Sequence, residues 1–170
     1  WSSGFGSKYS NPSTLPTDFG LDIAFSPDGN NVAVVHGGSP YVAVYSWSSG
    51  FGSKYSNPST LPTNTGRGVA FNPDGDVIAV AHSSSPYVTA YPWSSSGFGT
   101  KYSNPSTLPS GTCYAVTFNS DGDVIAVSHA GSLYVSAYAW SSGFGSKYSN
   151  PSSPPNETGR AVTFTPADQG

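Results

Sequence analysis

The chain has 170 residues, a formal net charge of −3, one cysteine and no methionine. Its length suits one domain of ordinary size. Six basic against nine acidic residues give no electrostatic footprint for nucleic acid or for an anionic membrane, so we expect neither as a partner. The polarity comes from Ser, Asn, Thr and Gly, which favours an extracellular or virion surface. The missing initiator methionine predicts a piece of a longer or processed protein.

A repeat of about 46 residues runs through the whole chain. Its start is marked by Trp1, Trp47, Trp93 and Trp140, and residues 1–17 are identical to residues 47–63. A fixed period of this length indicates a repeat architecture. The expected segments are a partial unit with an outer strand at 1–19, complete units at 20–65, 66–112 and 113–158, and a partial unit with an inner strand at 159–170.

Each complete unit predicts four short strands. In the second unit they are expected at 68–71, 76–82, 87–91 and 97–102. The first two flank Asn72-Pro73-Asp74-Gly75, where Pro and Gly suit a tight turn. The 76–82 strand is apolar on both faces, as expected between neighbouring sheets. No segment of helical period exceeds one turn.

A four-stranded unit repeated at this period is typical of a β-propeller blade. The first hairpin also resembles WD-repeat and YVTN-type propellers, where it often reads V-A-F-S-P-D-G. In this chain the motif occupies 23–29, 69–75 and 116–122. The tandem units further resemble those of uncultured tailed-phage proteins. We therefore predict an all-β fold, a β-propeller of four-stranded antiparallel blades of about 46 residues, with an incomplete ring in one chain.

Strand counting predicts that this ring is not closed by one chain. The chain supplies three complete blades, an outer strand at 1–10 and an inner strand at 160–165, whereas propellers use four to eight blades. Open blade faces and strand edges favour association. We expect a binding or assembly scaffold that closes as a homo-oligomer, with two copies sharing blades. The alternatives are closure by a longer parent protein, and an excised or engineered fragment with no ligand of its own.

Equivalent histidines end the second strand of each unit. Because they belong to different blades and no carboxylate accompanies them, we predict structural histidines, no metal site and no cofactor. Hairpin pairing brings them near the first strand, at a position that varies among the copies and holds Leu21 in the first. Variation within a repeat favours a ligand groove, and neutral drift is the equally simple alternative. The candidate ligand-facing residues are Arg67, Tyr114, Arg160, His36, His82 and His129.

The tryptophans support an alternative function as a glycan-binding, lectin-like propeller. Aromatic faces stack on sugars, and repeated shallow sites increase avidity. A tryptophan at a fixed blade position also packs between blades as core, which we favour. The candidate glycan-stacking residues are Trp1, Trp47, Trp93 and Trp140.

The remaining polar residues predict no catalysis. The Asp-Gly pairs fit turn chemistry, the four lysines protect outer strands from aggregation, and Cys113 is an incidental free thiol. No Ser-His-Asp arrangement, phosphate loop or pair of catalytic carboxylates is found. We therefore predict that the chain is not an enzyme.

Overall fold

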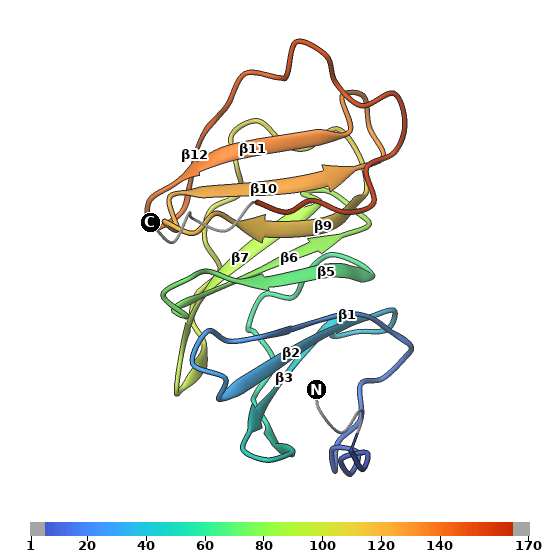
Figure 1. Ribbon diagram of the computed structural model, residues 1–170, viewed down its shortest axis with the longest axis vertical. Coiled ribbons are helices and arrows are strands. Elements are labelled where there is room, and N and C mark those ends of the chain that lie inside the picture. The colour runs from blue at the N-terminus through green and yellow to red at the C-terminus, as the bar shows by residue number, and fades with distance from the viewer. Residues whose placement is uncertain (1–5, 165–170) are drawn as a thin grey trace.

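The computed structural model describes residues 6–164, which form three four-stranded antiparallel sheets and no helix. Figure 1 shows the sheets following one another along the long axis in chain order. The predicted all-β fold class is confirmed, and the three sheets are consistent with blades of an incomplete propeller. Since the described residues include no helix, none of sufficient length and apolarity to cross a bilayer is present among them.

Each blade is a simple up-and-down sheet in which neighbours in sequence are neighbours in space. The first blade contains β1 (Gly20–Phe25), β2 (Asn31–His36), β3 (Val42–Trp47) and β4 (Phe51–Lys54). The second contains β5 (Gly66–Phe71), β6 (Val77–His82), β7 (Val88–Ser94) and β8 (Gly97–Phe98). The third contains β9 (Cys113–Phe118), β10 (Val124–His129), β11 (Val135–Trp140) and β12 (Phe144–Lys147). The inner strands β1, β5 and β9 contact one another in that order.

The Asp-Gly turns join the first two strands of every blade, as the sequence predicts. Gly75 closes one of them with φ of 74°, a left-handed conformation that glycine adopts without steric cost. In the same turn the Asn72 side chain accepts hydrogen bonds from the backbone of Asp76 and Val77, at 3.0 and 2.9 Å. Local turn chemistry therefore fixes where the second strand begins.

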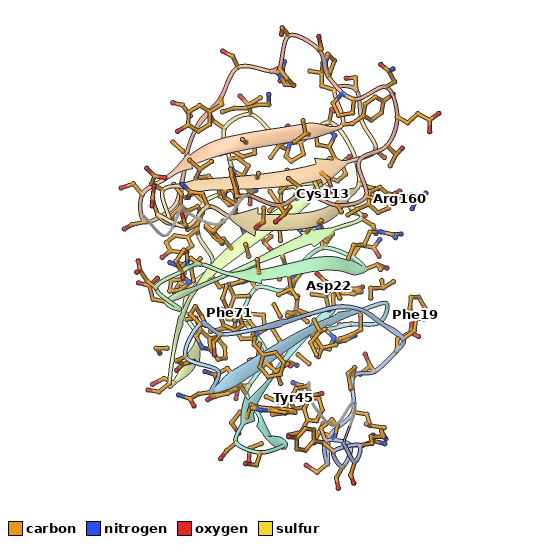
Figure 2. All side chains as sticks on the ribbon, in the orientation of Figure 1. Phe19, Asp22, Tyr45, Phe71, Cys113 and Arg160 are labelled. Atoms are coloured by element: carbon orange, nitrogen blue, oxygen red, sulfur yellow. The ribbon has the colours of Figure 1, made fainter. Side chains whose placement is uncertain are left out.

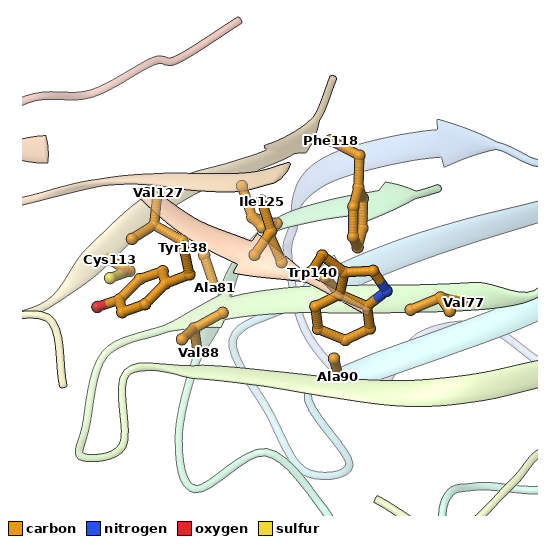
Figure 3. Packing of buried hydrophobic residues seen from close by; sticks show 12 residues of the cluster. Val77, Ala81, Val88, Ala90, Cys113, Phe118, Ile125, Val127, Tyr138 and Trp140 are labelled. Carbon is orange, nitrogen blue, oxygen red and sulfur yellow. The ribbon is translucent and has the colours of Figure 1, made fainter. Parts of the chain in front are cut away.

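The core lies between the blades, where the apolar faces of adjacent sheets meet. Figure 3 shows the junction of the second and third blades, in which the Trp140 indole lies beside Phe118, Val77 and Ala90. Burying such side chains contributes about 1.5–3 kcal/mol each. The middle strand β6 is buried along its whole length, which explains why its sequence is apolar on both faces.

An aromatic cluster marks the end of the third strand in each blade. The ring of Trp93 makes edge contacts with Tyr55, Phe98 and Phe71, with centroids 4.9, 5.1 and 6.1 Å away. Trp47 and Trp140 have equivalent neighbours. Because Tyr55 comes from the preceding blade, the cluster ties two successive blades together.

Some predicted strands are shorter or missing. The strand expected at 97–102 is limited to the two residues of β8, and Tyr87 precedes β7 in a turn with φ of 69°. No strand is found over the described part of the outer and inner strands expected at the two ends, 6–10 and 160–164. Each of these end segments lacks an adjacent strand of its own blade with which to form a ladder.

Candidate functional site

A β-bulge interrupts every inner strand at the same place. In the second blade Gly66 pairs with His82 and Gly68 pairs with Ala81, so that Arg67 has no pairing partner. The register shifts in the same way around Leu21 in β1 and Tyr114 in β9. Bulges turn the unpaired residue out of the regular alternation and are frequent beside functional sites. The variable position of the repeat is therefore the bulge position.

This bulge corrects the predicted register by one residue. The histidines at the ends of the second strands pair with the first residue of the inner strand, as His82 does with Gly66 and His129 with Cys113. The sequence analysis placed them nearest the residue that follows. The extra bulged residue accounts for the difference.

Two arginines, at this position of the repeat, each lie over the ring of one tyrosine. The Arg67 guanidinium carbon lies 5.1 Å from the centre of the Tyr114 ring, and that of Arg160 lies 5.2 Å from it. The Arg67 Nε also donates a hydrogen bond of 2.8 Å to the hydroxyl of Ser83. Cation–π contacts of this kind contribute about 0.5–1 kcal/mol each at exposed sites. The structure thus brings together three of the candidate ligand-facing residues, from β5, β9 and the segment that follows β12.

The histidines among those candidates do not face solvent. His36, His82 and His129 are fully buried in this structure. His82 lies 3.2 Å from the Thr63 hydroxyl through Nδ1. Burial lowers the pKa of all three, that of His82 to about 4, so they stay neutral near pH 7. Their position is that of structural residues beneath the loops between the second and third strands.

The tryptophans are core residues wherever the structure describes them. Trp93 and Trp140 are only 5% and 6% exposed, and Trp47 is half-buried. Their rings pack against the tyrosines and phenylalanines described above, and Trp93 and Trp140 present little surface to a sugar. Trp1 lies outside the described residues.

The lysines hold the turns after the outer strands, a role the sequence analysis missed. Lys54 Nζ donates to the Asn57 side chain at 2.5 Å, and Lys101 does the same to Asn104. Lys8 and Lys147 contact the asparagines at the same spacing. The K-Y-S-N-P sequence repeated in every copy was the signal for this contact.

Two further features bear on chemistry. Burial raises the pKa of the Cys113 thiol well above its usual range, which keeps it protonated and unreactive. Among residues 6–164, no three His, Cys, Asp or Glu side chains are grouped so that they could hold a metal ion. Sequence reasoning missed Ser83, which fixes Arg67; its position holds Gly37 and Ala130 in the other units, so variation among the copies was the available signal.

The fold is similar to that of known propeller-like proteins. A structure from Bacteroides fragilis with the provisional name 6-phosphogluconolactonase superposes with a TM-score of 0.66 at 13% identity, covering 79% of this chain and 38% of its own. A protein of the same provisional name from Bacteroides uniformis gives 0.66 at 15% identity, with 95% and 49% covered. The U3-55K protein gives 0.61 at 11% identity, with 79% and 40% covered.

At these identities the likeness shows the fold alone, and this chain spans less than half the length of each neighbour. No protein-family model and no curated protein matches the sequence. The prediction that the chain is not an enzyme is nevertheless wrong, because two of these neighbours bear an enzyme name and an enzymatic activity is therefore not excluded. Missing catalytic motifs cannot exclude catalysis on a fold that hosts many functions.

Proposed function

We propose that this chain is a propeller-building scaffold that completes its ring by associating with a second copy of itself. The observation that supports this is the open face of the first blade. Ile23 and Phe25 of β1 are 53% and 49% exposed. At the equivalent positions Val69 is 4% and Phe118 8% exposed, because a preceding blade covers them.

The N-terminal segment already occupies part of a preceding blade. Tyr9 makes an edge contact with Trp47 at 5.1 Å, as Tyr55 does with Trp93 at 4.9 Å. The Tyr45 hydroxyl also donates to the carbonyl of Thr14 at 2.8 Å. Residues 6–19 therefore take the place of an outer strand with its following loop.

The C-terminal segment occupies the inner position of a following blade. A Cβ on Gly159 would lie 2.6 Å from the Tyr134 carbonyl oxygen, just as one on Gly66 would lie 2.3 Å from that of Tyr41. The contact of Arg160 with Tyr114 continues the line of inner strands. Residues 159–164 and 6–19 thus correspond to the inner and outer strands of one blade, without its two middle strands, and two copies can share this partial blade.

The driving force is burial of the apolar end face. Leu21, Ile23 and Phe25 are 42%, 53% and 49% exposed, and half-burying such a side chain contributes about 1 kcal/mol. In the closed ring these residues of the first blade lie next to the 159–164 segment of the second copy, in which Val162 and Phe164 are half-buried in the single chain. Closure through two copies forms two such junctions, and each strengthens the other.

Charge substitutions on the open face test this proposal. Ile23→Asp places a carboxylate on the face without disturbing a packed core, so we expect the sedimenting mass to fall to that of one chain. The matched control is Leu108→Asp, since Leu108 is 38% exposed on the loop before the third blade. It should keep the mass of the parent protein. Association that survives Ile23→Asp unchanged would contradict the proposal.

A further inference from the structure

We propose that the bulge residues Arg67 and Tyr114, with Arg160 at the equivalent position of the repeat, form a binding site for a small oxyanion, a phosphate monoester or a carboxylate. This inference concerns the inner strands of one chain and does not require ring closure, although Arg160 belongs to the segment that the proposed function places beside Leu21 of a second copy. The site is made from residues far apart in the sequence, which the propeller topology brings to neighbouring inner strands.

The backbone is shaped to present these side chains. A β-bulge in β5 leaves Arg67 unpaired, and the equivalent bulge in β9 does so for Tyr114. Side chains at a bulge leave the plane that neighbouring strand residues follow, so they reach each other across adjacent blades. Gly68 permits this approach, since a Cβ there would lie 2.8 Å from the Tyr114 carbonyl oxygen.

The guanidinium groups are oriented but not neutralised. Arg67 is held through its Nε by a neutral hydroxyl, that of Ser83, which leaves its two terminal nitrogens without a partner among residues 6–164. Arg160 is exposed, and its guanidinium lies over the Tyr114 ring. Neither guanidinium forms an ion pair in the described chain. Planar N–H pairs of this kind match the two oxygens of a carboxylate or phosphate.

The distribution of arginine strengthens the inference. Arg67 and Arg160 are the two arginines of the chain, and both occupy the bulge position of the repeat. The equivalent position holds Leu21 in the first blade and Tyr114 in the third. Figure 2 shows Arg160 at the edge of the molecule, on the same side as Phe19. The tyrosine ring fixes the guanidinium planes in advance, which lowers the entropy lost on binding.

The side-chain Nε–H signals of the two arginines give a direct assay. In ¹H–¹⁵N spectra we expect both signals, and no other side-chain signal to the same extent, to shift saturably on addition of glycerol 3-phosphate or lactate. Inorganic phosphate shows whether the ester group is needed, and glycerol is the neutral control. Saturable shifts with the phosphates identify a phosphate site, and with lactate alone a carboxylate site. Shifts as large with glycerol, or none with any anion, would overturn the inference.

Variants separate a built site from general attraction to positive charge. Arg160→Gln alters an exposed side chain and should weaken binding of the preferred anion about tenfold, the effect of losing one charge-assisted pair. Arg67→Gln should do the same, and Tyr114→Phe should keep binding because the ring remains. Lys101→Gln removes the same charge from an outer turn and should change affinity less than twofold. Equal losses for Lys101→Gln and Arg160→Gln would overturn the proposal.

Discussion

The close contact of the inner strands β5 and β9 can be tested at Gly68. A Cβ at this position would lie 2.7 Å from the Ala115 Cα and 2.8 Å from the Tyr114 carbonyl oxygen. Both are backbone atoms, so Gly68→Ala has to push the two blades apart. Overpacking of this kind costs about 1–3 kcal/mol, while Gly→Ala without a clash gains roughly 0.4–1 kcal/mol through the unfolded state. We expect a net loss of about 1–2 kcal/mol in the free energy of unfolding.

Gly20 provides the control, since it is a glycine of inner strand β1, two residues before Asp22, which is the equivalent of Gly68 in the repeat. A Cβ on Gly20 meets only the Val34 Cγ1, at 3.6 Å, which is ordinary contact. Gly20→Ala should therefore be neutral or slightly stabilising. Urea denaturation of both variants, followed by tryptophan fluorescence at one protein concentration, measures the difference. Equal stabilities for the two variants would refute the reasoning, because they would mean that the inner strands are not in close contact.

Three further outcomes follow from buried polar groups. The pKa of His82 is about 4 in the fold against 6.5 when exposed, so the unfolded chain binds the proton first and stability should fall by about 2 kcal/mol from pH 7 to pH 5; urea midpoints at the two pH values check this. Tyr91→Phe removes a 2.9 Å hydrogen bond to the Thr60 carbonyl and should cost about 1 kcal/mol, whereas Tyr138→Phe should cost less, because the Tyr138 hydroxyl has no partner among the described residues; denaturation curves of the pair decide. Cys113 is fully buried and its pKa is raised, so Ellman's reagent at pH 8 should label it only after unfolding; rapid labelling of the native protein would contradict its placement.

The repeat unit and its strands could be predicted because the signals are local. Alternating and all-apolar runs, together with Asp-Gly turns such as Asp74-Gly75, fix strand type and boundaries within one copy. The length of the outer strand expected at 97–102 was overestimated. Whether these residues form a strand depends on their pairing with β7 and not on their own composition. The same dependence explains why neither end segment forms a strand.

The candidate site was predictable only in part. Variation among the copies indicated Arg67, Tyr114 and Arg160, and the structure brings these residues together. The β-bulge that presents them was not predictable, because a single extra residue in a strand leaves no mark on the apolar pattern. The histidines were grouped with them because the predicted strand pairing does not show whether a side chain is buried or exposed. His82 shows the difference, since it lies beneath its loop with no exposed surface.

The mass of the particle in solution tests the central claim, that copies of this chain associate to complete a propeller ring. Light scattering or native mass spectrometry of the full chain at micromolar concentration gives it directly. We predict a single species of twice the chain mass of 17.5 kDa. A monodisperse 17.5 kDa monomer would contradict the account, because the open face of β1 would then be stable in water without a second copy.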